Sequence, residues 1–396
     1  MTSIFSQIWA VVAMNIRSLP RRLWMSLAAV FAVTVVVAVL LSFLSMARGF
    51  SQTLEGAGSE STAIITRSGS RSELNSSMSN ETVKILSTAP GIARDANDNP
   101  IYSAELYVIV DGIKRTSKTE ANIPMRGISP VGFDLRENVE IIEGRLFTTG
   151  RNEIIVGAGV LREFEGFEIG KELRFGNTEW TVVGVFSTGG SAFESELWTD
   201  ARTVQTQFRR GSSYQTMRVL LETPGDVSGM VELVENDPRL NLDVETEAAF
   251  FAEQGEALSY IVIVGWVISF LMALGALAGA LNTMYTSVSS RAAEIATLRA
   301  LGFSNTSAFV GTLVESVLLS LIGGAIGAFL SYIFMDGIST STLGASFTQV
   351  VFTFSLTSDL FINGVWLALI IGVVGGFFPA WQAARLPVMV AFRQGN

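Results

Sequence analysis

The sequence predicts a membrane protein with an all-α domain of four transmembrane helices and an α+β extracytoplasmic domain inserted between the first and second helices. Two observations carry this prediction. Of the 396 residues, 49% are hydrophobic and 16% are charged, whereas soluble domains carry about 25% charged residues. The charge is also unevenly spread, because four long stretches are nearly free of it, at residues 23–46, 257–290, 304–335 and 360–384.

Each charge-poor stretch is longer than the roughly 20 apolar residues that a helix needs to cross a bilayer. The first, second and fourth stretches contain no charged residue, and the third contains only Glu315. A buried helix of a soluble protein is the alternative for any single stretch, but four in one chain predict four spans. We place these spans at residues 23–47, 259–286, 305–335 and 360–384.

The basic residues outside the inserted domain predict the orientation of the spans. Arginines precede the first span, occupy the 287–304 loop and follow the last span in the 385–396 tail, whereas the 336–359 loop has neither Lys nor Arg. The positive-inside rule therefore predicts that both termini and the 287–304 loop are cytoplasmic and that the 336–359 loop is extracytoplasmic. We expect a multi-pass protein surrounded by the lipid bilayer.

Residues 1–22 are predicted to be a cytoplasmic interfacial helix. Apolar residues recur there at helical spacing, and three arginines follow them, which is typical of a helix lying at the membrane surface. The apolar residues are Ile4, Ile8, Val11, Val12 and Ile16. A disordered start is the alternative.

Residues 48–258 form the predicted extracytoplasmic domain, which is acidic, with 32 Asp and Glu against 20 Lys and Arg. Runs with strand patterning lie at residues 63–66, 106–110, 139–142, 153–156, 179–186 and 217–222. Helical patterns lie at residues 80–88, 160–165, 201–208 and 227–236, the last with Asp226 as its N-cap and Pro238 as its stop. We expect two lobes. No clear breaker adjoins the flanking spans, so their helices are expected to continue into this domain.

The composition excludes several kinds of chemistry. The chain has no Cys and no His, which excludes Cys/His zinc sites and catalytic triads built on imidazole or thiolate. The Gly-Lys-Ser/Thr of a P-loop is missing too, because the only lysine after a glycine, Lys171, precedes Glu172. We predict a non-catalytic chain that binds no metal, cofactor or nucleic acid. Acidic groups at Glu163, Glu165 and Glu168 and at Glu194 and Glu196 are predicted to form a solvated surface, with acid/base catalysis as the alternative.

The 287–304 loop contains a short predicted amphipathic helix. Ile295, Leu298 and Leu301 are expected near one face, with Arg291 and Glu294 toward another. Gly302 fits a C-cap and Ser304 the N-cap of the next helix. A loop that only connects two spans does not need this amphipathic pattern, although a helix resting on the lipid surface is an alternative.

The same loop resembles a known family. Its residues 291–302, with Arg291, Glu294, Ile295, Leu298, Arg299 and Gly302 at fixed spacing, resemble the R-x-x-E-I-x-x-L-R-A-L-G signature of MacB/FtsX-like (LolC/LolE-type) ABC transporter permeases. The end of the fourth span is similar to the family tail G-x-x-P-A-x-x-A-A, here from Gly376 to Ala384. Glu315 and the segments 141–147, 152–157, 167–171 and 180–185 extend the resemblance, the last four to the MacB-type periplasmic core domain.

This resemblance implies the permease subunit of an ABC transporter that works by mechanotransmission. A separate dimeric cytoplasmic ATPase, which would bind ATP and Mg, is expected to hold the 291–302 coupling helix through Arg291, Glu294, Ile295, Leu298, Arg299, Leu301 and Gly302. We expect ATP hydrolysis to drive export or extraction of an amphipathic substrate on the outer side, and the Leu298→Arg substitution to abolish association with the ATPase. The resemblance also implies a location in the bacterial plasma (inner) membrane, a permease homodimer and a periplasmic adaptor (membrane fusion) protein. MacB itself carries its ATPase on the same chain, and no such segment is present in this sequence.

Small residues in the spans also favour close helix packing. The pairs Gly275 and Gly279, Gly323 and Gly327, and Gly372 and Gly376 share the G-x-x-x-G spacing, which allows helix backbones to approach closely in lipid. We assign them to packing within the protomer or in the dimer. The charge of Glu315 is costly inside a span, so we expect it to hold the third span against a neighbour near the arginines of the predicted cytoplasmic side.

Two rival functions remain open. The first is an FtsX-like transmitter that controls a cell-wall hydrolase, although the outer domain of about 210 residues is larger than that of FtsX. Lipoprotein-releasing permeases share the same topology, so the resemblance does not fix the substrate. The second rival is a membrane-anchored enzyme acting through external carboxylates, which leaves the 291–302 signature unexplained.

Overall fold

The computed structural model describes residues 4–70, 72–136, 138–237, 239–256, 259–343 and 349–385. The chain divides into two compact units. The membrane unit comprises Met1–Arg48, Ser259–Asp336 and Ser355–Asn396, and the inserted unit comprises Gly49–Leu258 and Gly337–Phe354. The predicted tail at 385–396 lies outside the described residues beyond Arg385.

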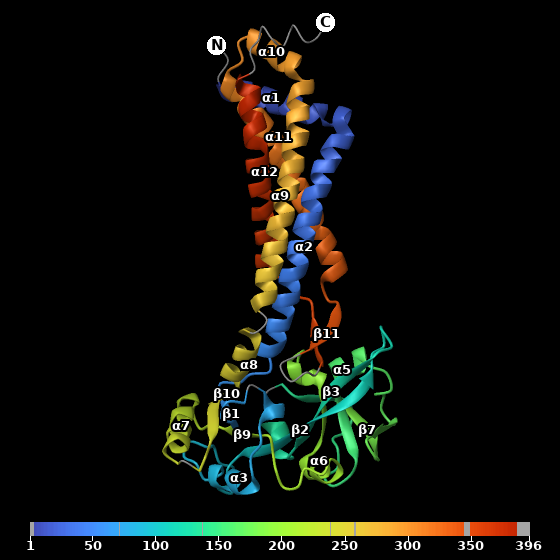
Figure 1. Ribbon diagram of the computed structural model, residues 1–396, viewed down its shortest axis with the longest axis vertical. Helices are drawn as coiled ribbons and strands as arrows, with labels where there is room; N and C mark the ends of the chain where they lie inside the picture. Colours follow the sequence, from blue (N-terminus) through green and yellow to red (C-terminus); the bar gives the residue numbers. More distant parts are fainter. Residues whose placement is uncertain are drawn as a thin grey trace. The chain divides into compact units, whose positions relative to one another are not determined.

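Four long helices make up most of the membrane unit, as the sequence predicts (Figure 1). They are α2 (Leu23–Glu55), α9 (Ser259–Ser290), α11 (Asn305–Met335) and α12 (Ser358–Arg385). All four have a stretch long and apolar enough to cross a membrane. They pack through a core that includes Val37 and Leu41 of α2, Ala328 of α11 and Ala368 of α12. As expected, α2 runs without a break past Arg48, the last residue of the membrane unit in this segment.

The N-terminal segment of the membrane unit is helical from its first described residue. It forms α1 (Ile4–Ser18) and the 3₁₀ helix η1 (Leu19–Arg22). Val11 and Asn15 on one face of α1 are buried, while Phe5 and Trp9 are 83% and 75% exposed. Such exposed aromatic residues are typical of a helix at a membrane surface.

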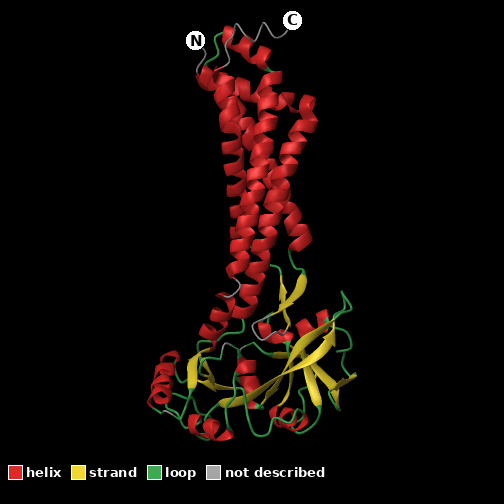
Figure 2. Ribbon diagram, viewed as in Figure 1, coloured by secondary structure: helices red, strands yellow, loops and turns green. Residues whose placement is uncertain are grey.

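The inserted unit is built on one mixed sheet, which confirms the α+β prediction (Figure 2). Among the described residues the sheet has ten strands in the order β10-β1-β9-β2-β3-β8-β5-β7-β4, with β6 paired to β7. The strands are β1 (Thr62–Arg67), β2 (Tyr102–Ile113), β3 (Glu120–Ile128), β4 (Glu140–Gly144), β5 (Glu153–Gly157), β6 (Glu172–Phe175), β7 (Thr178–Ser187), β8 (Leu197–Asp200), β9 (Thr216–Leu220) and β10 (Leu242–Thr246).

The long strand β2 joins two hydrophobic cores. Its first residues, Tyr102 to Glu105, pair with β9, whereas the residues from Leu106 to Ile113 pair with β3. One core gathers around β3, β5 and β7, with Phe164 and Trp180 among its members. The other gathers around β1 and β9, and includes Met217. The two predicted lobes therefore appear as two cores along one continuous sheet.

Short helices cover the sheet. They are η2 (Glu73–Asn75), α3 (Asn80–Leu86), α4 (Val131–Asp134), α5 (Ala158–Glu163), η3 (Ala192–Ser195), α6 (Ala201–Gln207), η4 (Pro224–Asp226), α7 (Val227–Asn236) and α8 (Glu247–Glu256). The predicted cap of α7 is wrong, because the Asp226 carboxylate accepts hydrogen bonds from the backbone N–H and hydroxyl of Thr223 before the 3₁₀ turn. Pro238, the predicted stop, lies outside the described residues.

The segment between the third and fourth spans is more than the loop that the sequence predicts. Its strands β11 (Ser339–Leu343) and β12 (Gln349–Thr353) form an antiparallel hairpin that belongs to the inserted unit. Val351 enters the core around β5 and β7, and its backbone N–H donates to the hydroxyl of Ser195 at 2.8 Å. The inserted unit is therefore assembled from two separate segments of the chain.

Candidate functional site

The predicted loop helix exists as α10 (Ala292–Ala300). Gly302 follows it with φ +95°, which is the left-handed conformation that favours glycine at a helix C-terminus. Ser304 then caps α11 by accepting a hydrogen bond from the Ser307 backbone N–H at 3.2 Å. Both predicted caps are confirmed, and they fix where α10 ends and where the third span begins.

The faces of α10 differ from the prediction. Ile295 is only 7% exposed, and both it and Leu298 line a small cavity with Val11 of α1. Leu301 is 74% exposed. The three residues therefore do not share one face, because Leu301 lies six positions beyond Ile295 and a helix turns 100° per residue.

The outward face of α10 consists of small and polar residues with one large apolar side chain. Its exposed members are Ala293, Glu294, Thr297, Ala300 and Leu301. Arg299, by contrast, is half-buried and lines the same cavity as Leu298. Leu298 thus faces the membrane unit itself, and Leu301 is the large apolar side chain that a partner protein can reach.

Arg291, which the sequence places on a polar face, is instead buried beside Glu315. The Glu315 carboxylate is 3% exposed and receives Nη1 of Arg291 at 3.3 Å and Nη2 of Arg22 at 3.4 Å. We call these three residues the membrane cluster. The expected ion pair between the third span and nearby arginines is confirmed.

Polar neighbours hold both arginines of the membrane cluster. Arg291 donates to Oδ1 of Asn15 at 2.5 Å and to Glu294 at 3.2 Å. Arg22 donates to the hydroxyls of Ser287 and Ser18. Asn15 and Ser287 are not predicted as site residues from the sequence, in which the only signal for Asn15 is a polar residue in an otherwise apolar helical stripe.

The three glycine pairs have two different environments. A Cβ added at Gly323 or Gly327 would lie 2.6 Å from the carbonyl oxygen of Val30 or Thr34 of α2. Added at Gly372 or Gly376, it would lie within 2.9 Å of atoms of α11. At Gly275 and Gly279 of α9 an added Cβ meets nothing within 4 Å. Two pairs therefore serve packing within the protomer, and the α9 pair lies on an exposed face.

The inserted unit contains a larger group of buried charges, which we call the sheet cluster. Seven residues, each at most 6% exposed, come from β2, β3, β9, α8, η2 and the loops after α4 and η3. They are Glu73, Glu105, Arg126, Arg136, Glu196, Arg218 and Glu247.

Every arginine of the sheet cluster is bound by carboxylates. Arg126 donates to Glu73 and Glu196 at 2.6 Å and to Glu105 at 3.0 Å. Arg218 donates to Glu73 and Glu105 at 2.6 Å and to Glu247 at 2.7 Å. Arg136 reaches Glu105 at 2.7 Å. These ion pairs join the two cores where β2 changes partner.

The surrounding charges shift the pKa values of the buried carboxyls. Burial alone would raise the pKa of Glu73, but Arg126 and Arg218 outweigh it and lower the pKa to about 2. The pKa of Glu105 is likewise lowered by Arg136, Arg218 and Arg126 against its burial. At Glu247 the effect of burial is larger than that of the nearby Arg218, so the pKa of this carboxyl is raised.

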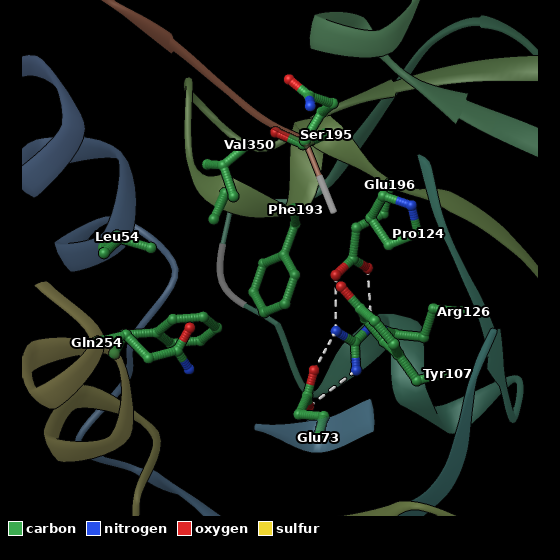
Figure 3. A pocket seen from close by; sticks show the side chains of 13 residues that line it. Leu54, Glu73, Tyr107, Pro124, Arg126, Phe193, Ser195, Glu196, Gln254 and Val350 are labelled. Atoms are coloured by element: carbon green, nitrogen blue, oxygen red, sulfur yellow. Dashed lines mark hydrogen bonds and ion pairs between the residues drawn. The ribbon is translucent and has the colours of Figure 1, made fainter. Parts of the chain in front are cut away.

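A cavity of about 40 Å³ adjoins the sheet cluster (Figure 3). It lies between Leu54 at the end of α2, Gln254 of α8, Phe193 of η3 and Val350 of β12, with Arg126 on another wall. Figure 3 shows Arg126 between the carboxylates of Glu73 and Glu196. Because carboxylates already occupy this guanidinium, its hydrogen-bonding capacity toward a ligand is largely used.

The predicted acidic surface is wrong at three positions, because Glu163, Glu194 and Glu196 are buried. Glu194 accepts backbone N–H groups of Thr188 and Gly190 and pairs with Arg162. The exposed Glu165 and Glu168 are paired with Lys118 and Arg115. These carboxylates are used for structure, which gives the enzyme alternative no support.

The fold and the loop helix together define a class of protein: a four-span membrane protein with a large inserted α+β unit and a short helix between its second and third spans. Residues 26–236 match the MacB-like periplasmic core domain, and residues 266–388 match the FtsX-like permease C-terminal domain. The chain belongs to the MacB/FtsX-like family of ABC transporter permeases.

Individual relatives are distant. The macrolide export ATP-binding/permease protein MacB of Hahella chejuensis is 27% identical over 58% of this chain, and only 35% of its own length is covered. The uncharacterized ABC transporter permease YknZ of Bacillus subtilis is 24% identical over 70% of this chain and 72% of its own length. The crystal structure of the periplasmic region of MacB from Actinobacillus actinomycetemcomitans aligns with 50% of this chain and 94% of that chain, at 16% identity and a TM-score of 0.36. The chain spans less than half the length of the MacB relatives it matches.

Proposed function

We propose that this chain is the transmembrane subunit of an ABC transporter that works by mechanotransmission. A separate cytoplasmic ATPase dimer binds ATP and Mg and seats α10, and movement of the spans changes the shape of the inserted unit on the outer side. The outcome is export or extraction of an amphipathic substrate. The orientation rests on the arginines of the predicted cytoplasmic side.

The observation that carries this proposal is the two-sided environment of α10. Its inward side chains, such as Ile295, are buried against the membrane unit. Its outward face is accessible and carries Leu301, an exposed leucine flanked by the small residue Ala300 and by Gly302. A surface helix with one exposed apolar anchor among small residues suits insertion into a groove of a partner protein.

The test is a pull-down of the tagged protein from its native membrane in mild detergent, comparing wild type with Leu301→Arg. We expect a P-loop ATPase with wild type and at least a ten-fold loss in the variant, since about 1.4 kcal/mol corresponds to ten-fold in affinity and an arginine replaces an apolar anchor. Leu146→Arg, a change at another exposed leucine, is the matched control and should keep the ATPase bound.

The pull-down also decides between the remaining functions. Undiminished ATPase recovery with both Leu301→Arg and Thr297→Arg would contradict the role of the outward face of α10. A cell-wall hydrolase recovered with wild type would favour the FtsX-like transmitter, and a periplasmic adaptor would favour export. A lipoprotein recovered as cargo would favour the lipoprotein-releasing permease.

We also propose that the permease is a homodimer that packs through α9. Only 17% of the candidate span in α9 is buried inside the protomer, compared with 33% to 50% for the other three. Gly275 and Gly279 lie on its exposed face, and Asn282, seven positions after Gly275, is exposed on the same face. A polar amide facing lipid is costly, and a second copy supplies an amide partner together with close glycine packing.

Cross-linking through introduced cysteines tests this interface, because the natural chain has none. Ala278→Cys on α9 should give a disulfide-linked dimer, and adding Gly275→Leu should reduce its yield. Ile370→Cys on the exposed side of α12 is the control and should give little dimer. Equal yields from both cysteines would contradict packing through α9.

A further inference from the structure

The membrane cluster places one buried carboxylate between two arginines that come from different parts of the chain. Glu315 belongs to α11, Arg22 ends η1, and Arg291 directly precedes α10. Arg22 and Arg291 approach the carboxylate through different oxygens, Oε1 and Oε2. One side chain of α11 therefore holds both the N-terminal segment and the start of the loop helix.

The charges of this cluster are not balanced within the buried site. Two guanidinium groups face one buried carboxylate, and Arg291 has a second acceptor in Glu294, whose side chain is 58% exposed. Arg291 can therefore shift toward Glu294 while Arg22 keeps the buried Glu315 paired. Arg291 therefore has two positions in which its charge is paired with a carboxylate, one at Glu315 and one at Glu294.

Arg291 connects α10 to two other helices. The Arg291 carbonyl accepts the N–H of Ile295 in the first turn of α10, so the residue is joined to that helix. Its guanidinium is joined to α11 through Glu315 and to α1 through Asn15. A displacement of α10 thus pulls on two other helices through one side chain.

We propose that Glu315 and Arg291 are positioning residues that transmit movement of α10 to the third span. Arg22 compensates the charge of Glu315 and contacts Ser18 and Ser287, and in this proposal it lies outside the path from α10 to α11. This inference rests on the proposed function, because it takes the partner ATPase as the source of the movement. It adds the residues through which the movement passes beyond α10.

Two matched substitutions test the proposal. Arg291→Gln and Arg22→Gln each remove one guanidinium from the same carboxylate and leave the other to pair with it. A purely structural cluster predicts similar consequences for the two changes. Transmission predicts that Arg291→Gln uncouples the protein, whereas Arg22→Gln does not.

The measurement uses the full complex in detergent, with the copurified ATPase either nucleotide-free or trapped with ATP and vanadate. Hydrogen exchange of β2 and β9 in the inserted unit reports the output, and ATPase recovery reports binding. We expect normal recovery in both variants, but an ATP-dependent change in exchange that falls about 5-fold or more in Arg291→Gln alone. Glu315→Asp, which keeps the charge and shortens the side chain, should give an intermediate loss.

The outcomes separate this inference from the proposed function. If wild type binds no ATPase, or shows no ATP-dependent change, the proposed function fails and this inference falls with it. If wild type responds and Arg291→Gln responds equally, transmission through Arg291 is overturned and the proposed function stands. Equal losses in Arg291→Gln and Arg22→Gln would assign the cluster to structure alone. If Arg291→Gln does not fold, a full response in Glu315→Asp overturns the proposal.

Discussion

The sheet cluster and the membrane cluster use the same chemistry, buried arginines against buried glutamates, in opposite proportions. The sheet cluster has four carboxylates for three arginines, and its closest contacts with Arg126 and Arg218 are 2.6 Å. The membrane cluster has one buried carboxylate for two arginines, at 3.3 and 3.4 Å. Arg126 and Arg218 therefore each contact three carboxylates at 3.0 Å or less, whereas Arg22 and Arg291 each make one longer contact with the buried carboxylate of Glu315.

The two clusters also differ in the secondary-structure elements that carry them. Glu105, Arg126 and Arg218 project from three adjacent strands, β2, β3 and β9, whose backbone ladders already fix their spacing. The residues of the membrane cluster come from helix ends and one span, which no ladder connects. The strand ladders therefore hold the members of the sheet cluster at fixed spacing, whereas in the proposal above the membrane cluster links helices that move relative to one another.

Removing one arginine of the sheet cluster should have the largest effect. Arg218→Met leaves Glu73, Glu105 and Glu247 with fewer partners in a buried site, and breaking a buried ion pair costs about 3–5 kcal/mol. We expect the inserted unit to unfold at markedly lower urea concentration. Pulse proteolysis of the full-length protein in detergent measures this change.

A surface pair provides the control for this substitution. Arg239 contacts Asp237 at 2.5 Å, but its side chain is 76% exposed, and exposed pairs contribute little. Arg239→Met should therefore leave the urea midpoint nearly unchanged. A midpoint for Arg218→Met equal to that of Arg239→Met would mean that the sheet cluster does not hold the inserted unit together.

The two regions also differ in how much of them the sequence reveals. The spans, the caps at Gly302 and Ser304, and the pairing of Glu315 follow from local patterns, because charge is expensive in lipid and few partners are available to it. The sheet cluster does not follow from the sequence. Its members are separated by up to 174 positions, from Glu73 to Glu247, and each one resembles an ordinary surface charge.

The missed elements have similar physical causes. The strand β3 contains Pro124 and the buried Arg126, which conceal the alternation that identifies strands. The hairpin of β11 and β12 joins a core made by residues about 200 positions earlier, and no local pattern in the hairpin sequence predicts this distant contact. The face of α10 was misassigned because the positions of α1 and α11 decide which side of it is buried.

Acid should weaken the sheet cluster. Folding lowers the pKa of Glu73 from 4.5 to about 2, so its carboxylate stabilises the fold fully above pH 4.5 and progressively less as the pH falls toward 2. At about 1.4 kcal/mol for each pH unit, this contribution is about 3 kcal/mol. Glu105 acts in the same direction, whereas the raised pKa of Glu247 acts in the opposite one.

Urea unfolding of the full-length protein in detergent at pH 7 and at pH 3 measures this effect through Trp180 and Trp198, which are fully buried in the inserted unit. The other five tryptophans, all in the membrane unit, are replaced by Phe. We expect a lower midpoint at pH 3, and a smaller pH dependence in Glu73→Gln. Asp237, whose pKa is also lowered to about 2 but which lies at the surface, supplies the control Asp237→Asn, which should keep most of the dependence. A pH dependence that survives intact in Glu73→Gln would show that the sheet cluster is not what acid disrupts, and the contrast between the tightly paired sheet cluster and the membrane cluster would lose its electrostatic basis.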